Sequence, residues 1–405
     1  MLKNFLTLGA GEILARGLHA IAFLFLARRA GKEALGIFGF AATVNTYVLI
    51  AVIQGFDTPA TRETSRDPSK ILEYVQRIIG LRLFLAVFGL AGMWSCVTLF
   101  HPEHPLGLML TILSLSYVTN SISPKWAFIA QETTRPLAIA SLVQECFFFA
   151  GALLIQSPSQ VYWIAAAQLT GEFVHAGFLM FKLSSRIGLF RPILDWKFSW
   201  WIIRESAPIT MGVFLASMMG NFDVMALKAM TNDSAVGLYL AAFRCTTVFG
   251  PLISAVSAVV LPRFSRGYPE PTSMRRNAVY YGSLAFAGLS AAALALSLFP
   301  ALVLRLLYGV GYQDGAYILR VVVWVLPLQG MRAVLRPLLF AFHLQRLDLR
   351  NMAFGVVTNA VLDIILIPHF GPAGCAISSV VSELVLVAAC LLVIRRRFSA
   401  PQPIQ

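Results

Sequence analysis

The chain has 405 residues, of which 58% are hydrophobic and only 13% are charged. This balance excludes a soluble globular protein and indicates an integral membrane protein. The formal net charge of +13 would suggest a nucleic-acid partner in a soluble protein, but in a membrane protein it reflects the retention of Lys and Arg in cytoplasmic loops. We therefore expect no nucleic-acid partner.

Apolar runs repeat along the chain at the length of roughly 20 residues that a helix needs to cross the hydrocarbon core. They predict an all-α integral membrane protein with about twelve transmembrane helices. The predicted spans of the first half are 5–27, 35–56, 78–100, 106–124, 137–155 and 161–182. Those of the second half are 207–229, 236–260, 278–299, 316–340, 353–370 and 373–394.

The distribution of Lys and Arg between the predicted loops sets the orientation. Short cytoplasmic loops retain basic residues, and most of the Lys and Arg outside the spans fall on the cytoplasmic side if both termini are cytoplasmic. Trp196, Trp200 and Trp201 lie among Lys197 and Arg204, a pattern that predicts an amphipathic helix at the cytoplasmic interface.

The two halves share a faint internal repeat. Residues 34–42 read ALGIFGFAA and residues 235–243 read AVGLYLAAF, each at the start of the second helix of its half. Such repeats are typical of secondary transporters. We predict an N-terminal six-helix lobe at 1–190, an amphipathic connector at 191–206, a C-terminal six-helix lobe at 207–397 and a short cytoplasmic tail at 398–405, with a substrate site between the lobes.

Charged residues inside the first span indicate transport. Glu12, Arg16 and His19 follow one another at helical spacing, so they share one face of that span. A charge at mid-bilayer costs on the order of 3 kcal/mol or more unless it has a partner or a watery cavity, and such residues usually line a transport path.

Sequence patterns for nucleotide, metal or disulfide sites are missing. Residues 309–315 read GVGYQDG, which lacks the Lys of a phosphate-binding loop and follows no predicted strand. The five cysteines fall in apolar spans at spacings that suggest neither a metal site nor a disulfide framework. We expect no cofactor, no metal and no ATP hydrolysis by this chain, so a proton or sodium gradient is the available energy source.

Five segments, in order along the chain, resemble a known family. Two of them are the N-terminal run NFLTLGAGEILARGLHAIAFLFLARRAGKEALGIFGFA and GFDTPATRETSRD at 55–67. The others are NFDVMALKAMTNDSAVGLYLAAFR at 221–244, LLYGVGYQDGAYILR at 306–320 and FGPAGCAISSVVSE at 370–383. They resemble the polysaccharide flippases of the MOP superfamily, the Wzx-type exporters of lipid-linked repeat units, which share the MATE-like fold.

The resemblance implies a function and a location. Such proteins have two six-helix lobes around a central cavity. They move an undecaprenyl-pyrophosphate-linked oligosaccharide from the cytoplasmic to the outer leaflet by alternating access. We therefore expect a non-enzyme of the bacterial inner membrane that serves the synthesis of O-antigen, capsule or exopolysaccharide. Its partners would be the lipid-linked oligosaccharide, membrane lipids and other polysaccharide assembly proteins.

Arginines near or inside the spans are candidates for binding the pyrophosphate, because a guanidinium grips phosphate bidentately. Four of them stand near the cytoplasmic ends of spans: Arg62, Arg82, Arg332 and Arg336. The alternative for these is contact with lipid headgroups. Two lie deeper, Arg16 and Arg244, and Arg16 has the alternative of an ion pair with Glu12 one turn earlier.

Acidic residues inside the spans are candidates for ion coupling. A carboxyl group in a low-dielectric cavity can take up and release a proton or bind sodium. We select Asp223, Glu12, Glu172 and Asp363. For Glu145 and Glu383 we favour pairing between helices or a hydrogen bond to Ser, Thr or the backbone.

Two other functions remain open at this point. The surplus of acids inside the spans is compatible with a multidrug or organic-cation antiporter of the same superfamily. A membrane-embedded polysaccharide polymerase or ligase also has many spans, but it would need a sizeable outer loop with converging polar residues. The only outer cluster here is His101, Glu103 and His104, which the interleaved prolines make a turn.

Overall fold

The structure, a computed structural model, describes residues 2–53, 55–267 and 271–399. Every regular element in these residues is a helix, which confirms the all-α prediction. The chain divides into two compact units, Met1–Phe214 and Leu215–Gln405.

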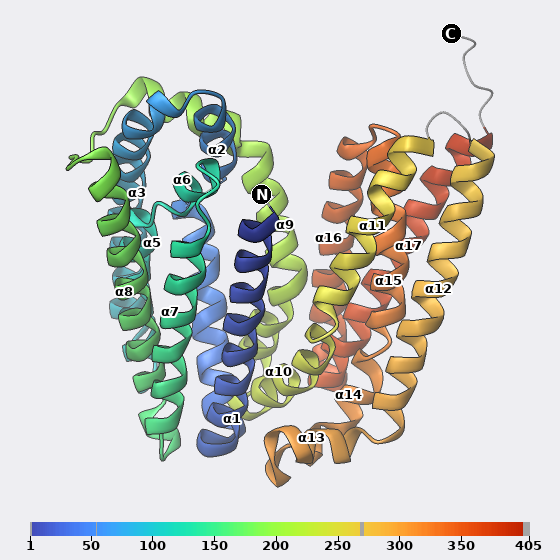
Figure 1. The fold of residues 1–405 in the computed structure, drawn as a ribbon. Helices are drawn as coiled ribbons and strands as arrows, with labels where there is room; N and C mark the ends of the chain where they lie inside the picture. Colours follow the sequence, from blue (N-terminus) through green and yellow to red (C-terminus); the bar gives the residue numbers. More distant parts are fainter. Residues whose placement is uncertain (1, 54, 268–270, 400–405) are drawn as a thin grey trace. The chain divides into compact units, whose positions relative to one another are not determined.

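The first unit holds α1 to α8 and the beginning of α9 (Figure 1). The α-helices are α1 (Leu2–Ile53), α2 (Asp57–Arg66), α3 (Ile71–Phe100), α4 (Leu106–Ser114), α5 (Ser116–Ile122), α6 (Lys125–Ala130), α7 (Arg135–Leu154), α8 (Tyr162–Ile187) and α9 (Trp196–Met230), and the short 3-10 helices are η1 (Pro68–Lys70) and η2 (Pro158–Gln160).

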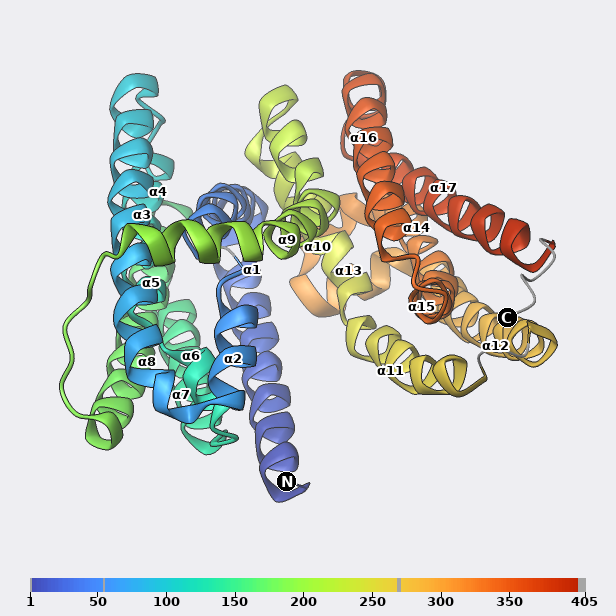
Figure 2. The ribbon, with the colours of Figure 1, turned by 90° about the horizontal axis from the view of Figure 1, so that it is seen from above.

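The second unit holds the rest of α9 and all later helices. These are α10 (Asp233–Thr247), α11 (Gly250–Gly267), α12 (Pro271–Leu298), α13 (Pro300–Tyr308), the 3-10 helix η3 (Val310–Gly315), α14 (Ala316–Val322), α15 (Val325–Ala341), α16 (Gln345–Phe370) and α17 (Pro372–Ser399). Helix α15 is central in this unit, with α11, α12 and α17 packed against it (Figure 2).

The membrane spans agree with the prediction. Eleven helical stretches among the described residues are long and apolar enough to cross a membrane. The first, Gly11–Arg66, has 56 residues, and a straight helix of that length would measure roughly 84 Å. It is broken at Gly31, whose φ of 78° and ψ of 178° are not helical, so it contains most of the first predicted span as well as the second. Glycine is the residue that adopts such a positive φ at no steric cost.

Residues 196–206 of the predicted connector are helical, but they form the beginning of the long helix α9 rather than a separate short helix. Asp195 caps the start of α9, since its Oδ1 accepts hydrogen bonds from the backbone N–H groups of Lys197 and Phe198 at 3.0 and 3.1 Å. The helix is amphipathic here: Phe198 and Ile202 are buried in the core of the first unit, whereas Trp200 is exposed. It then continues to Met230 without a break, through Pro208.

Each unit has its own apolar core. In the first, Ile78 of α3, Phe128 of α6, Leu179 of α8 and Ile202 of α9 belong to one buried cluster. In the second, a cluster joins α11, α12, α15 and α17: Val260, Phe264, Met274, Val334, Leu335, Leu338, Leu339, Val387, Cys390 and Ile394. The close packing of α15 in this core fixes the positions of the polar residues on its other faces.

Candidate functional site

Two arginines of α15 are held by carboxylates of the neighbouring helices. Arg332 donates through Nη2 to Oε1 of Glu383 in α17 at 2.8 Å. Arg336, one turn further, donates through Nε and Nη2 to both carboxylate oxygens of Asp348 in α16, at 2.8 to 3.2 Å. Both carboxylates are buried, so each guanidinium is oriented by a charge-assisted bond. The interhelical pairing expected for Glu383 is confirmed.

The two arginines line one pocket between α11 and α15, with a volume of about 520 Å³. Ser254 and Ser257 of α11 and Gln329 of α15 also line it. The two paired carboxylates are not among the lining residues, so the pocket presents guanidinium, hydroxyl and amide groups. Nε of Arg332 is buried and has no partner among the described residues. The pocket therefore has the chemistry of a site for an anion that also carries hydroxyl groups.

Two buried aspartates form a second cluster where α9, α10, α16 and α17 meet. Asp223 of α9 accepts hydrogen bonds from the hydroxyl of Tyr239 and from Oγ of Ser379, the latter at 2.7 Å. Asp363 of α16 accepts one from Ser378. The two carboxyl groups are close enough to interact with each other.

This aspartate cluster has unused acceptors and lacks a balancing cation. Oδ1 of Asp223, Oδ2 of Asp363 and Oδ1 of the nearby Asn359 are buried without a hydrogen-bond partner among the described residues. No Lys or Arg in the described part of the chain forms an ion pair with either aspartate. A buried charge without compensation is costly, so these oxygens are suited to hold a proton or a small cation.

A polar cluster also lies inside the first unit, around Glu172 of α8. Its carboxylate accepts hydrogen bonds from Thr119 at 3.0 Å, Asn120 at 3.1 Å and Gln168 at 3.1 Å. The positive charge of Lys125 also acts on it. Together with His175, most of these residues line a small cavity of about 40 Å³. Both ring nitrogens of His175 are buried without a hydrogen-bond partner among the described residues.

Glu12, Arg16 and His19 lie in one continuous helix, α1, as their helical spacing predicts. Glu12 and Arg16 approach each other to 3.7 Å, with side chains that are 53% and 74% exposed. His19 pairs through Nδ1 with Oε2 of Glu145 in α7 at 2.9 Å, and its ring stacks on Phe148. The interhelical pairing expected for Glu145 is confirmed.

The remaining candidate arginines occupy separate places. Arg82 of α3 is almost fully buried and donates to Asp57 at 2.7 Å and to the carbonyl of Ile53 at 3.3 Å. Arg62 is half exposed and bonds Glu63 and Glu205, each at 3.0 Å. Arg244 of α10 lies near Tyr308. Of the six candidates, the structure brings Arg332 and Arg336 into one pocket.

Several residues of these clusters carry no sequence signal strong enough to select them. Tyr239, Ser378 and Ser379 are ordinary residues of apolar helices and become relevant only through their bonds to Asp223 and Asp363. Asn359 precedes Asp363 by one helical turn, and this spacing is the sequence feature that could have selected Asn359 as a neighbour of Asp363. In the described residues no group of three or more His, Cys, Asp or Glu is arranged to hold a metal ion, and the five cysteines are free.

Known proteins resemble this chain in sequence. It is 22% identical over 256 residues to the putative O-antigen transporter of Escherichia coli (strain K12). The match covers 61% of this chain and 61% of that protein, so the chain spans less than two thirds of the length of this curated relative.

The fold resembles solved transporters. Compared with the lipid II flippase MurJ, the TM-score is 0.80 at 14% identity, over 96% of this chain and 87% of the other. Compared with an inward-facing multidrug resistance MATE family transporter of the MOP superfamily, it is 0.73 at 16% identity, over 94% of each chain. At these identities the likeness establishes an all-α membrane transporter fold. These proteins are transporters and flippases rather than catalysts, which supports the expectation that the chain is not an enzyme.

The family itself is shown by sequence. Residues 1–268 match the family described as polysaccharide biosynthesis protein, Polysacc_synt, which is more than half of the 405 residues. The resemblance of the five segments to polysaccharide export proteins is supported by this match, and the chain belongs to the Polysacc_synt family of polysaccharide biosynthesis proteins.

Proposed function

We propose that this protein moves an undecaprenyl-pyrophosphate-linked oligosaccharide from the cytoplasmic to the outer leaflet of the bacterial inner membrane, by alternating access. The product would feed surface polysaccharide, as O-antigen, capsule or exopolysaccharide. The observation that carries the proposal is the pocket lined by Arg332 and Arg336. Membership of the family and the flippase-like fold support it.

The arginine pocket suits such a headgroup for three physical reasons. A pyrophosphate is an anion whose oxygens match the planar fork of a guanidinium. The hydrogen bonds that the two guanidiniums donate to Glu383 and Asp348 hold them in place before the substrate arrives, which lowers the ordering cost of binding. The hydroxyl of Ser254 can donate to a sugar hydroxyl or accept from one, whereas Oγ of Ser257 donates to the carbonyl of Ala333 at 2.8 Å and offers an acceptor.

The other candidate arginines take different parts in this proposal. Arg16 on the exposed face of α1 and Arg244 of α10 would contact the headgroup during its passage. Arg82 and Arg62, which hold Asp57 and Glu205, would position the helices that carry them. The lobes at 1–190 and 207–397, joined by residues 191–206, would be the parts that rock, with both termini in the cytoplasm.

The aspartate cluster is the proposed coupling site. Uptake of a proton or a sodium ion by Asp223 and Asp363 would compensate one of the two negative charges of these buried carboxylates and so relieve their mutual repulsion. Because the pair is built from α9, α10, α16 and α17, its occupancy would change how these helices pack. Glu172 and Glu12 in the first unit are further candidates for the same role.

The test is whether the chain restores surface polysaccharide in a bacterium that lacks its own repeat-unit flippase. Labelling of glycolipid at the outer leaflet should rise with the wild type. Arg336→Lys keeps the charge but not the two-pronged bond to Asp348, and it should reduce labelling. Arg350→Gln changes an exposed arginine outside the pocket and should not.

One result would replace the proposal with the antiporter alternative. In that case the inserted wild-type protein would leave the glycolipid inside and increase the efflux of a cationic dye. A pocket lined by two arginines disfavours a cationic ligand, so we expect no such efflux.

A further inference from the structure

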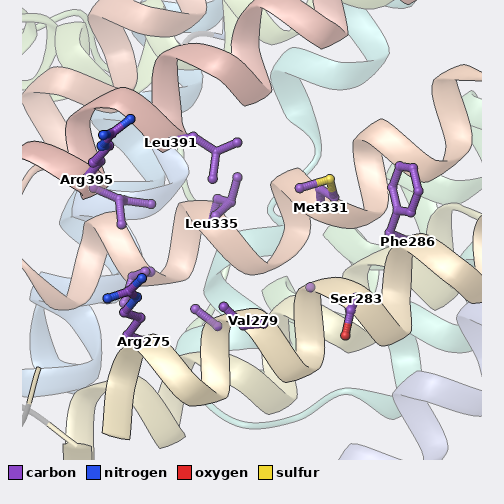
Figure 3. Close-up of a pocket in the computed structure, with 12 residues that line it drawn as sticks. Arg275, Val279, Ser283, Phe286, Met331, Leu335, Leu391 and Arg395 are labelled. Carbon is purple, nitrogen blue, oxygen red and sulfur yellow. The ribbon is translucent and has the colours of Figure 1, made fainter. Parts of the chain in front are cut away.

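A groove lies on the opposite face of α15 from the arginine pocket. Met331, Leu335 and Leu338 of α15 line the groove, whereas Arg332 and Arg336 line the pocket. Helices α12 and α17 form its other walls, and its volume is about 780 Å³ (Figure 3). The whole groove belongs to the second unit.

The groove is charged at one end and apolar along its length. Arg275 of α12 and Arg395 of α17 lie at the same end of the groove, on facing walls (Figure 3). Val279, Phe286 and Leu391 are among the apolar residues that line the rest. Both arginines are exposed, and neither forms an ion pair with an acid in the described part of the chain. The charged end therefore attracts an anion, while the walls attract hydrocarbon.

The length of the groove corresponds to one leaflet. Arg275 and Phe286 are eleven positions apart on α12, which is roughly 16 Å at about 1.5 Å per residue. The hydrocarbon core of a bilayer is about 30 Å thick, so the apolar part reaches about half-way across. The charged end lies where α12 begins and α17 approaches its end, which places it at headgroup depth.

We propose that the groove between α12, α15 and α17 binds one anionic phospholipid of the adjacent leaflet. Arg275 and Arg395 hold its phosphate, and its acyl chains lie along the apolar walls. Two unpaired guanidiniums favour a head group with a net negative charge over a zwitterionic one. This site is separate from the proposed substrate pocket, but both use α15: the bound lipid packs against Met331, Leu335 and Leu338, on the face opposite to Arg332 and Arg336.

Two variants, each with a matched control, distinguish binding of a lipid at this groove from non-specific contact with lipid. Arg275→Gln/Arg395→Gln removes the charge at the groove, and Arg346→Gln/Arg350→Gln removes two exposed charges of α16 that do not line it. Gly282→Phe places a ring in the groove, where a Cβ would meet nothing within 4 Å. Gly288→Phe is its control, since it also faces open space on α12 but does not line the groove.

The measurement is native mass spectrometry of the full chain in detergent, titrated with phosphatidylglycerol and with phosphatidylcholine of the same acyl chains. We expect one phosphatidylglycerol to be retained by the wild type and by both controls. Loss of two arginines near the membrane surface should weaken its binding about thirtyfold, and Gly282→Phe should abolish it.

Two results would overturn the proposal. The first is equal retention of the two lipids by the wild type. The second is wild-type affinity for phosphatidylglycerol in the Arg275→Gln/Arg395→Gln variant. This second test does not depend on whether Gly282→Phe folds.

Discussion

Replacing Arg332 separates a role in substrate binding from a role in stability. Its bond of 2.8 Å to Glu383 neutralises a carboxylate whose side chain is only 4% exposed. Arg332→Met leaves that carboxylate buried and unpaired, which costs about 3 to 5 kcal/mol. In Arg332→Met/Glu383→Leu both charges are gone, and replacing a buried pair by apolar residues is often close to neutral. We therefore expect the single variant to be strongly destabilised and the double variant to recover most of the loss.

Stability and transport are measured on the same variants. Thermal unfolding in detergent can be followed by the reaction of the buried thiols of Cys245, Cys375 and Cys390 with a fluorogenic dye, once the exposed Cys96 and Cys146 have been replaced by Ser. Transport is followed by labelling of glycolipid at the outer leaflet. The double variant should be stable but inactive, because the pocket has lost a guanidinium.

Recovery of transport together with stability in the double variant would refute the reasoning. Arg332 would then be needed only to neutralise Glu383. The proposed contact of Arg332 with the pyrophosphate would have to be abandoned.

Three further predictions concern single residues. Asp363→Asn removes one of the two facing carboxylates while its side chain can still accept the bond from Ser378, so glycolipid flipping should lose its dependence on the ion gradient; an unchanged dependence would exclude this cluster as the coupling site. Gly374→Val would drive a Cβ to within 2.7 Å of the backbone of Leu366, so α16 and α17 must separate, and thermal unfolding should show a loss of about 1 to 3 kcal/mol. Asp195→Ala removes the cap of α9 and should cost about 1 kcal/mol in the same assay.

The spans could be predicted from sequence because each one must bury its backbone in hydrocarbon. Hydropathy therefore located both parts of α1, and the structure adds only that Gly31 is where they meet. Hydropathy did not predict the full length of α9. The predicted span begins at residue 207, yet the helix begins at Trp196 and continues through Pro208, as neighbouring helices allow in a membrane protein.

Helical spacing predicted part of the candidate site. Arg332 and Arg336 are one turn apart, so they had to share a face of α15, and they line one pocket. Their partners could not be predicted in this way. Glu383 is 51 residues from Arg332, and which helix packs against α15 depends on the whole unit rather than on local sequence.

The contacts within the aspartate cluster also could not be predicted from local sequence. Asp223 and Asp363 were candidates because each is an acid inside an apolar span. That they face each other follows only from the packing of α9 against α16 and α17. The hydroxyl groups of Ser378 and Ser379 complete the cluster, and serine is too common in membrane helices to have been selected.

The most direct test of the central claim uses the purified protein in proteoliposomes. A fluorescent undecaprenyl-pyrophosphate-linked oligosaccharide is placed in both leaflets, and its exposure to a membrane-impermeant quencher is followed after a proton or a sodium gradient is imposed. The account predicts net movement that depends on one of these gradients, persists in Arg350→Gln and is lost in Arg336→Gln. Gradient-independent movement, or equal movement in the two variants, would contradict it.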